Sequence, residues 1–256
     1  METMVSRTLS VHKEHEVLLK LETAGLNDEL AQRVIESPGN ELAAKVVKLI
    51  QGGGFQPTTS QKRAREIMGR NMFGVEEAIQ RFGVIPTSQQ VAALSEIPFS
   101  EAVLQESKDT HILVAVFPPS ILEIRGKVTG QRLFYEQDWY NQQAFAKEKG
   151  ETGWQLVAKT PVENSTKKNW DEQCSLLGEN DEVPTAQVMT YTIIGHHLAT
   201  GERLFECIYV RTSSVVSEGL RVHVGHFGAQ GLHVRGYWDG DRDGSLGVSS
   251  ARKSPQ

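Results

Sequence analysis

The fold is decided by residues 211–253, which read RTSSVVSEGLRVHVGHFGAQGLHVRGYWDGDRDGSLGVSSARK. Runs 221–224 and 232–235 alternate apolar and polar residues, so they predict two strands with one buried face. We expect Val222, Val224, Leu232 and Val234 on the buried face, and His223, His233 and Arg235 on the exposed face. The glycines between the runs indicate tight turns, and the aromatic residues Phe227 and Trp238 are predicted to anchor the segment in a core.

The composition of this segment differs from that of the remaining chain. Between residues 212 and 252 there is no Lys or Met, and there is one Glu (Glu218), one Gln (Gln230) and one Trp (Trp238). The side chains without an evident packing role are His, Arg, Ser, Gly and Tyr. All of these arise from an AAC or AAT codon by changes at adenines alone, whereas Lys, Glu, Gln, Met and Trp do not.

In this respect the chain resembles the variable proteins of diversity-generating retroelements, in which adenine-directed reverse transcription rewrites codons near the end of a gene. The matching pattern is Arg221-Val222-x-Val224-Gly225-x-Phe227, Gly231-Leu232-x-Val234, Trp238-Asp239-x-Asp241-Arg242, Leu246-Gly247-Val248 and Ala251-Arg252-Lys253. Upstream, residues 199–206 (ATGERLFE) also resemble the family. The resemblance covers the C-terminal half with good specificity and the N-terminal half less specifically.

The resemblance implies a C-type lectin-like domain, of the formylglycine-generating-enzyme type, that binds protein or other macromolecular ligands at its C-terminal face. The implied variable, ligand-contacting positions are Ser214, Leu220, His223, His226, Gly228, His233, Arg235, Gly236, Tyr237, Gly240, Gly244 and Ser245. Tyr237 and Arg235 are the expected energetic anchors, because Tyr and Arg dominate binding hot spots. The alternative is a β-rich domain with a fixed, His- and Gly-rich surface.

Enzymes of the implied fold use residues that this sequence lacks. Formylglycine-generating enzymes use two cysteines late in the domain, and no Cys follows Cys207. Iron-dependent relatives use a His cluster ending in His-x-Glu, which is also missing. We therefore expect no catalytic residues and no cofactor, and we interpret Cys207 as a small buried residue on a strand. A metal-dependent oxidoreductase stays open as the alternative.

Three groups of residues suggest metals without the expected ligand pattern. His223, His226 and His233 are candidate zinc or copper ligands, but their spacing does not make them converge. Residues 239–244 resemble the start of an EF-hand loop, yet Ser250 stands where the bidentate Glu belongs. A turn in which Asp239 or Asp241 pairs with Arg242 or caps local amides is therefore favoured. His196 and His197 are adjacent and therefore diverge in regular structure. The sequence predicts no metal site.

The overall composition is typical of a folded, water-soluble protein. The chain has 256 residues, 39% hydrophobic and 23% charged residues, and a formal net charge of −5. The acidic balance argues against a nucleic-acid partner, since phosphates require a basic face. Neither a transmembrane run nor a signal-peptide core is apparent, so we expect no membrane partner and a cytoplasmic location.

Four regions are predicted along the chain. Residues 1–51 form a small helical region, 52–58 a glycine-rich linker, 59–108 a helical segment and 109–256 the lectin-like domain, with its variable region at 211–253. Asn27 is the expected N-cap of a helix at 28–35. The apolar stripes of residues 12–51 are expected to bury against each other or against a second copy of the chain, which predicts a homo-oligomer or a structural adaptor.

The predicted fold class is α+β, with short mixed or antiparallel strands, helices and a long irregular C-terminal segment. Strands are expected at 112–117, 121–126, 154–157 and 204–210. A long helix is expected to start within residues 183–186 and to continue through Leu198, with Gly201 as its C-cap. Shorter helices are expected at 138–146 and 170–177.

Overall fold

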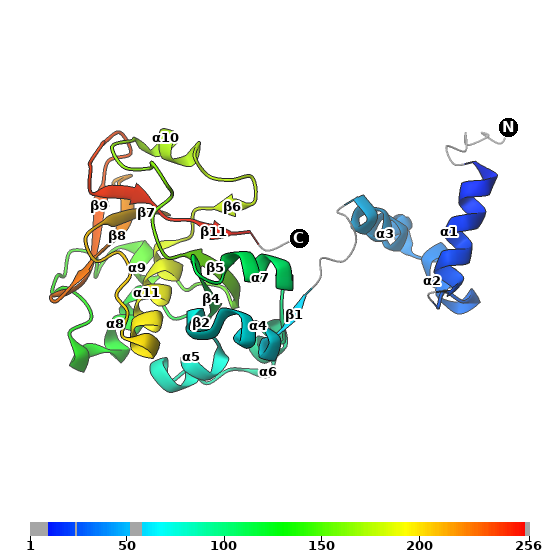
Figure 1. Cartoon of the computed structure of the whole chain (residues 1–256), viewed down its shortest axis with the longest axis horizontal. Coiled ribbons are helices and arrows are strands. Elements are labelled where there is room, and N and C mark those ends of the chain that lie inside the picture. The colour runs from blue at the N-terminus through cyan, green and yellow to red at the C-terminus, as the bar shows by residue number, and fades with distance from the viewer. Residues whose placement is uncertain (1–9, 24, 52–57, 254–256) are drawn as a thin grey trace. The chain divides into compact units, whose positions relative to one another are not determined.

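The computed structural model describes residues 10–23, 25–51 and 58–253. The chain divides into two compact units, Met1–Phe55 and Gln56–Gln256 (Figure 1). Apart from Thr58, the predicted linker 52–58 lies outside the described residues. The predicted helical segment 59–108 belongs to the second unit together with the rest of the chain.

The first unit contains α1 (Val11–Thr23), α2 (Asp28–Ile35), η1 (Pro38–Asn40) and α3 (Glu41–Gln51). The side chain of Asn27 accepts a hydrogen bond from the Leu30 amide at 2.9 Å, so α2 begins at the predicted N-cap. Neither α1 nor α2 contains a buried residue. The apolar side chains of these helices therefore do not bury against each other, and Leu18, Leu19, Leu21 and Leu30 are exposed.

The second unit is a mixed α/β structure. Its first part contains β1 (Thr59–Ser60), α4 (Gln61–Met68), η2 (Gly69–Asn71), β2 (Met72–Phe73), α5 (Val75–Phe82), α6 (Ser88–Ala93), β3 (Glu96–Ile97) and α7 (Glu101–Ser107). Phe73 and Phe82 pack their rings against each other and against Tyr191, with centroid separations between 4.8 and 5.8 Å. These helices therefore share one hydrophobic core with the C-terminal part of the chain.

A five-stranded sheet forms the centre of the second unit, in the order β2-β4-β5-β11-β6. Its strands are β4 (His111–Val116), β5 (Gly153–Ala158), β6 (Asp181–Glu182) and β11 (Ala251–Arg252), together with β2. β2 and β4 are parallel, and the other neighbours are antiparallel. The apolar run beginning at Ile112 is fully buried, as the sequence predicts for a central strand.

The decisive segment forms a second, four-stranded sheet in the order β10-β7-β8-β9. It consists of β7 (Tyr209–Val215), β8 (Arg221–Gly228), β9 (Gly231–Tyr237) and β10 (Leu246–Val248). The two predicted strands at 221–224 and 232–235 are confirmed as parts of β8 and β9, which form an antiparallel hairpin. Val222, Val224, Leu232 and Val234 are buried, as predicted.

Helix α11 (Ala186–Thr200) lies between the two larger sheets and contacts β4 on one side and β7 and β8 on the other (Figure 1). The Thr185 hydroxyl accepts from the Val188 amide at the N-terminus, and Gly201 ends the helix with a φ of 77°. Because the helix is surrounded by protein, most of its side chains are buried on all sides, as expected for a central helix.

Three local predictions are wrong. Residues 121–126 form helix α8 (Ile121–Lys127) instead of a strand, because the Ser120 hydroxyl and the Glu123 carboxylate form a capping box. The predicted strand at 204–210 begins only at Tyr209, and the preceding residues form turns. Cys207 lies in one of these turns and is exposed, so it is not a buried strand residue.

Trp238 does not anchor the core. Its side chain is 62% exposed, because β9 ends at Tyr237 and Trp238 begins a loop on the surface. Phe227, in contrast, is fully buried as predicted. The longest irregular stretch of the C-terminal segment is therefore residues 238–245, between β9 and β10, and most of the segment is regular sheet.

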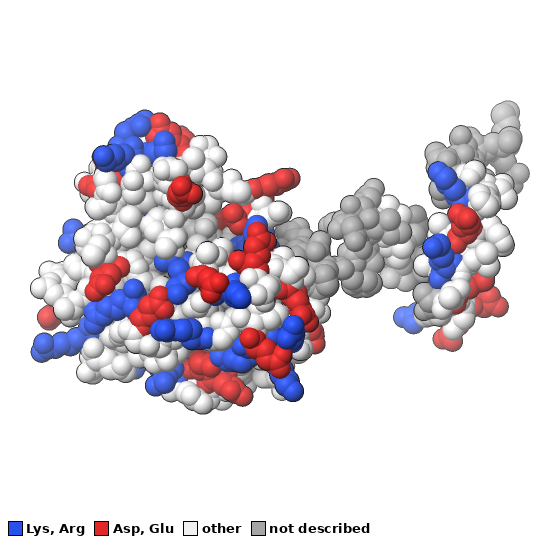
Figure 2. Space-filling view, in the orientation of Figure 1, with Lys and Arg blue, Asp and Glu red and all other residues white. Residues whose placement is uncertain are grey.

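The remaining short elements are η3 (Thr129–Gln131), α9 (Ala144–Lys147) and α10 (Trp170–Cys174). None of the helices in the described ranges is long and apolar enough to span a bilayer. Figure 2 shows Lys and Arg interspersed with Asp and Glu over the visible face of the second unit.

Candidate ligand-binding face

The four-stranded sheet has one face toward the core and one toward the loop 238–245. Val210, Val224 and Val234 are aligned across β7, β8 and β9 and belong to the core. The next residues along the strands, Arg211, His223 and Arg235, are also aligned and point to the opposite side, since side chains alternate along a strand. We call this second side the outer face.

Aromatic and imidazole rings cover much of the outer face around Tyr209. The Tyr209 ring lies 4.9 Å from His223, 4.3 Å from His226 and 6.2 Å from His233, measured between centroids. His223 continues the row with its edge against Tyr237 at 5.9 Å, and His233 continues it by stacking on Tyr135 at 4.0 Å. The face is therefore a nearly continuous π surface.

A cleft of about 570 Å³ opens on this face. Its lining includes several of the positions predicted to contact ligand: Leu220, His223, Arg235, Gly236, Tyr237 and Ser245. The other lining residues were not predicted: Gln137, Trp139, Tyr209, Asp243 and Leu246. The structure thus brings together positions from β8, β9 and the loop 238–245 around one concave site of the size typical for ligand pockets.

Gln137 and Trp139 come from a segment far away in the sequence. Gln137 Nε2 and Trp139 Nε1 each donate a hydrogen bond of 2.9 Å to the Val234 carbonyl, so they cover the outer edge of β9. Tyr135 extends the same edge through a backbone bond to the Leu232 carbonyl. Because nothing local marks residues 135–139 as neighbours of β9, sequence reasoning missed them. A further groove of about 1090 Å³ continues from Gln137 along residues 132–138.

The other predicted contact positions lie outside the cleft lining. His226 and His233 border it within the ring cluster, with their centroids 6.4 Å apart. Gly228 lies at the tip of the β8–β9 hairpin, and Gly240 and Gly244 lie in the loop 238–245. Ser214 is separate from all of these, because its hydroxyl accepts a hydrogen bond from the Ala186 amide at the start of α11.

Arg211 holds the loop 238–245 against the sheet. Its guanidinium donates hydrogen bonds of 2.9 Å to the carbonyls of Trp238 and Asp241. It also donates to the Lys168 carbonyl at 3.1 Å and to Gln173 Oε1 at 3.0 Å. Arg211 is fully buried, and this burial lowers its pKa. It is the structural support of one wall of the cleft.

Arg221 fixes the start of the same loop. Its guanidinium forms a bidentate pair with Asp239, with N–O distances of 3.0 and 2.8 Å, and lies 3.8 Å above the centre of the Trp170 ring. The predicted turn at 239–244 is thus stabilised by Arg221 rather than by Arg242, which pairs with Glu172 at 2.8 Å. Both residues of the Arg221–Asp239 pair belong to the sequence pattern on which the resemblance to retroelement variable proteins rests.

Two glycines of that pattern are required by close backbone approach. A Cβ on Gly225, where φ is 147°, would lie 2.1 Å from the Ile208 carbonyl oxygen. A Cβ on Gly231, where φ is 97°, would lie 2.5 Å from the Phe134 carbonyl carbon. Only glycine fits at either position without moving the backbone. These two residues set the distance of the hairpin from its neighbours.

His223 lies on the predicted face of the sheet. Its side chain is only 3% exposed, however, so the prediction that it is exposed to solvent is wrong. Burial is the main cause that lowers its pKa to about 4, and the positive charges of Arg211 and Arg235 contribute. Its imidazole is therefore neutral at pH 7. Its Nδ1 atom is buried and has no hydrogen-bond partner within the described residues.

The two charged residues that line the cleft differ in whether they already have a polar partner. Arg235 is exposed and lies 5.8 Å from the Tyr209 ring centre, and among the described residues no carboxylate pairs with it. Asp243 Oδ1, in contrast, accepts hydrogen bonds from the Ser245 amide and hydroxyl at 2.6 and 2.7 Å. Arg235 thus has no ion-pair partner within the described residues, whereas one oxygen of Asp243 is already engaged by Ser245.

No group of three or more His, Cys, Asp or Glu in the described part of the chain is arranged to hold a metal ion. His223, His226 and His233 are engaged in the ring cluster instead. Asp241 contributes its backbone carbonyl to Arg211, and Asp239 binds Arg221.

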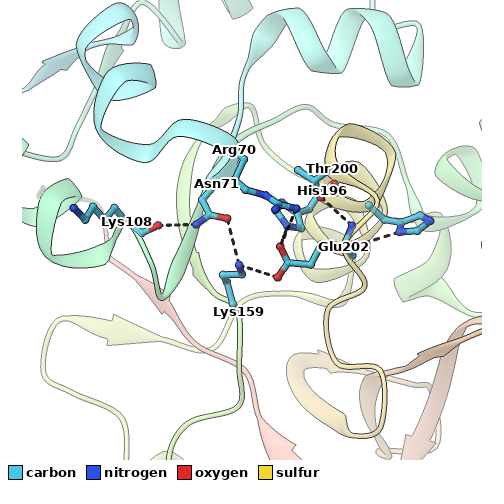
Figure 3. Close-up of polar contacts among 8 residues, drawn as sticks. Arg70, Asn71, Lys108, Lys159, His196, Thr200 and Glu202 are labelled. Atoms are coloured by element: carbon cyan, nitrogen blue, oxygen red, sulfur yellow. Dashed lines mark hydrogen bonds and ion pairs between the residues drawn. The ribbon is translucent and has the colours of Figure 1, made fainter.

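His196 and His197 have different surroundings, as their adjacency predicts. His196 is buried and its Nε2 lies 3.1 Å from Glu202 Oε2, while His197 packs edge-on against Phe227 at 5.0 Å. Glu202 also binds Lys159 Nζ at 2.8 Å and Arg70 at 3.5 Å (Figure 3). Burial lowers the pKa of His196, and the hydrogen bond from Lys159 is the main cause that lowers the pKa of Glu202.

This polar network connects three parts of the second unit. Asn71 in η2 accepts from Lys159 at 3.3 Å and donates to the Lys108 carbonyl at 2.6 Å, as Figure 3 shows. Glu202 follows the C-terminus of α11, and Lys159 follows β5. Since every labelled group already has a partner within the network, its role is to hold these segments together.

A scan of the chain against protein-family models finds no match, and searches for similar curated proteins and similar solved structures find none either. The chemistry of the outer face is therefore the basis for a function. It combines a rigid sheet, flat aromatic walls and an available guanidinium around one open cleft. Such an arrangement is suited to binding a ligand.

Proposed function

We propose that this chain is the variable protein of a diversity-generating retroelement. In this proposal the second unit is a C-type lectin-like domain without catalytic activity, and its outer face binds macromolecular ligands. Side chains around the cleft differ between copies of the gene, whereas the sheet that carries them stays constant. The helix packed between the two larger sheets, and the C-terminal segment that forms most of one of them, support this proposal.

The observation that carries the proposal is a division among the glycines of residues 211–253. Gly225 and Gly231, which belong to the constant pattern, have no room for a side chain. The glycines expected to vary do have room. A Cβ on Gly228 or Gly240 would meet no atom within 4 Å, and on Gly236 or Gly244 the nearest atom would lie at 3.4 or 3.5 Å. None of these four has a positive φ.

This division is what a diversified surface requires. A position that is rewritten at random must accept side chains of many sizes without moving the backbone. A position that sets the backbone path must keep one residue. His226 has an intermediate character, because its φ of 47° favours Gly, Asn, Asp and His over β-branched residues.

The test is the DNA directly downstream of the gene in its native genome. We expect a near-copy of the segment that encodes residues 211–253, differing only at positions where the copy has adenine, beside a reverse-transcriptase gene. The codons of Gly228, Gly236, Gly240 and Gly244 should align with adenine-containing codons, and those of Gly225 and Gly231 should not. A missing copy, or differences at the constant glycines, would disprove diversification.

The first unit supports a second role, in assembly. Its α1 and α2 contain no buried residue, although both carry several apolar side chains. Small helical units of this kind commonly complete their core with a partner. We propose that the first unit associates with other copies of the chain and so multiplies the binding faces in one assembly.

A further inference from the structure

We propose that the cleft of this particular chain binds a carboxylate held next to an aromatic ring, as an acidic residue beside an aromatic residue presents them on the surface of a partner protein. The inference rests on the proposed binding function of the outer face, and it names the chemistry that the present side chains select. It does not depend on how those side chains arose.

The exposed guanidinium in the lining of the cleft favours an anionic group. His223 lies in register between Arg211 and Arg235, so two guanidiniums flank one neutral imidazole. The hydrogen bonds of Arg211 go to carbonyl and amide oxygens, and Arg235 has its ring contact with Tyr209, so no carboxylate in the described residues pairs with either charge. Asp243 is the acidic residue of the lining, and the Ser245 amide and hydroxyl already occupy one of its oxygens.

Arg235 is the group that would meet the carboxylate. Arg211 is fully buried beneath the loop and is already saturated by four acceptors on its two terminal nitrogens. Arg235 is exposed and its guanidinium lies near the Tyr209 ring, so its planar fork is available for a bidentate contact with a carboxylate. A cationic ligand would be repelled by the same group.

The walls beside Arg235 suit an aromatic ring. Tyr237 and Trp139 line the cleft and are 43% and 39% exposed, which leaves parts of their ring faces open. The bond from Trp139 Nε1 to the Val234 carbonyl fixes the orientation of the indole. Gly236 carries no side chain between Leu220 and Trp139, so the space there stays free for a flat group.

Two small molecules that share the same phenol ring but carry opposite charges test the inference on the full-length protein. The first is 4-hydroxyphenylacetate and the second is tyramine, and their dissociation constants are measured by ligand-observed NMR titration at neutral pH. We expect the carboxylate to bind about tenfold more tightly than the amine, because only the carboxylate can form a charge-assisted contact with Arg235.

Variants assign the preference to the cleft. Arg235→Gln should remove the difference between the probes, and Arg235→Lys should retain part of it. Tyr237→Ala should weaken both probes to a similar extent. The matched control is Arg242→Gln, which removes another exposed guanidinium that is paired with Glu172 outside the cleft. This control should leave both affinities unchanged.

Three results would overturn the inference: equal or tighter binding of tyramine, no binding of either probe, or a preference for the carboxylate that survives Arg235→Gln in protein with an unchanged melting temperature. These results are separable from the fate of the proposed function. An adenine-matched copy in the genome together with a failed probe test would reject only the ligand chemistry. A successful probe test without such a copy would reject only diversification.

Discussion

At the scale of single residues, Gly225 controls how closely β8 approaches the chain before β7. Its φ of 147° and its contact with the Ile208 carbonyl exclude a side chain. Gly236, one strand away, has ordinary contacts and no positive φ. Both glycines look alike in the sequence, and both interrupt an alternating run. Only the backbone of the neighbouring segment distinguishes them.

The pair provides a matched test. Gly225→Ala should lower the free energy of unfolding by at least about 2 kcal/mol, because the methyl group must displace backbone atoms. Gly236→Ala should change it by less than about 0.5 kcal/mol. Urea denaturation followed by circular dichroism measures both values. Equal effects of the two substitutions would contradict the assignment of Gly225 to the constant framework.

His223 links the outer face to pH. Its pKa is lowered from 6.5 in the unfolded chain to about 4 in the folded protein. The unfolded chain therefore binds a proton first as the pH falls, and stability decreases between about pH 6.5 and pH 4. This loss should amount to about 3 kcal/mol for a shift of this size.

The variant His223→Phe keeps a ring at this position but does not titrate. We expect the difference in unfolding free energy between the variant and the wild type to change by about 3 kcal/mol between pH 7 and pH 4, in favour of the variant. Carboxylates that titrate in the same range contribute to both proteins and cancel. Parallel stability curves over this range would show that His223 titrates normally.

For single residues, the sequence predicted the face of the sheet on which a side chain lies better than it predicted how much of that side chain is exposed. The period of two placed Val222 and Val224 in the core and His223 on the other face. It did not predict that Tyr209 and Tyr237 cover the imidazole, because burial of an outward side chain depends on neighbouring strands. The prediction that Trp238 is buried is wrong, because the loop that begins at this residue places its side chain on the surface.

At the scale of secondary-structure elements, α8 shows how a short apolar run misleads. Residues 121–126 alternate in a way that is compatible with a strand, and periodicity cannot separate the two over so few residues. The deciding signal was Ser120 followed three residues later by Glu123, a capping box visible in the sequence. The longer helix α11 was predicted correctly, because Thr185 and Gly201 mark both of its ends.

The polar network around Glu202 stabilises the junction between α11, β5 and η2. The pKa of Glu202 is lowered from 4.5, mainly by the hydrogen bond from Lys159. A carboxylate with a lowered pKa adds stability that is fully present above about pH 4.5. That contribution is lost as the pH falls through the pKa of the folded state.

Replacing Glu202 with Gln should therefore lower the unfolding free energy at pH 7 by about 1 kcal/mol, a modest value because the carboxylate is partly exposed to solvent. The deficit should shrink toward pH 3. Glu66→Gln serves as the control, since its pair with Arg63 is about half exposed on both sides. Thermal melts at the two pH values would contradict the proposed role if both variants behaved alike.

At the scale of the whole molecule, the two units differ in how they satisfy their apolar residues. The second unit has an extended buried core, whereas the helices α1 and α2 have no buried residue. In the described part of the first unit, the exposed large apolar side chains are Val11, Val17, Leu18, Leu19, Leu21, Leu30, Ile35, Leu42, Val46 and Val47. Such a surface is expected to be covered by another molecule.

Removing residues 1–57 tests this expectation. The shortened protein should keep the melting temperature of the second unit, because the core of that unit lies entirely after residue 57. The full-length chain should form an oligomer in light scattering coupled to size-exclusion chromatography, and the shortened protein should be monomeric. A monomeric full-length chain would exclude assembly through the first unit.

The sequence predicted most helices and the two central strands, but it did not predict how the strands combine. β11 lies between β5 and β6, and β10 pairs with β7 in parallel. These pairings join residues far apart in the chain, and no local pattern encodes them. For the same reason, the sequence predicted only part of the cleft. Residues 220–245 are marked by composition, whereas Gln137 and Trp139 reach it only through tertiary structure.

The hydrogen bonds of Arg211 affect how the sequence of the loop 238–245 can change between generations. Within the loop, this residue binds the main-chain oxygens of positions 238 and 241, and every amino acid possesses such an oxygen. Mutations that replace the side chains at those positions leave both acceptors in place. The hydrogen bonds from Arg211 to the loop therefore do not depend on which amino acids occupy positions 238 and 241. Asp239 differs from these positions, because it pairs with Arg221 through its side chain. A lineage can therefore rewrite the other side chains of this loop without first evolving a new way to attach it.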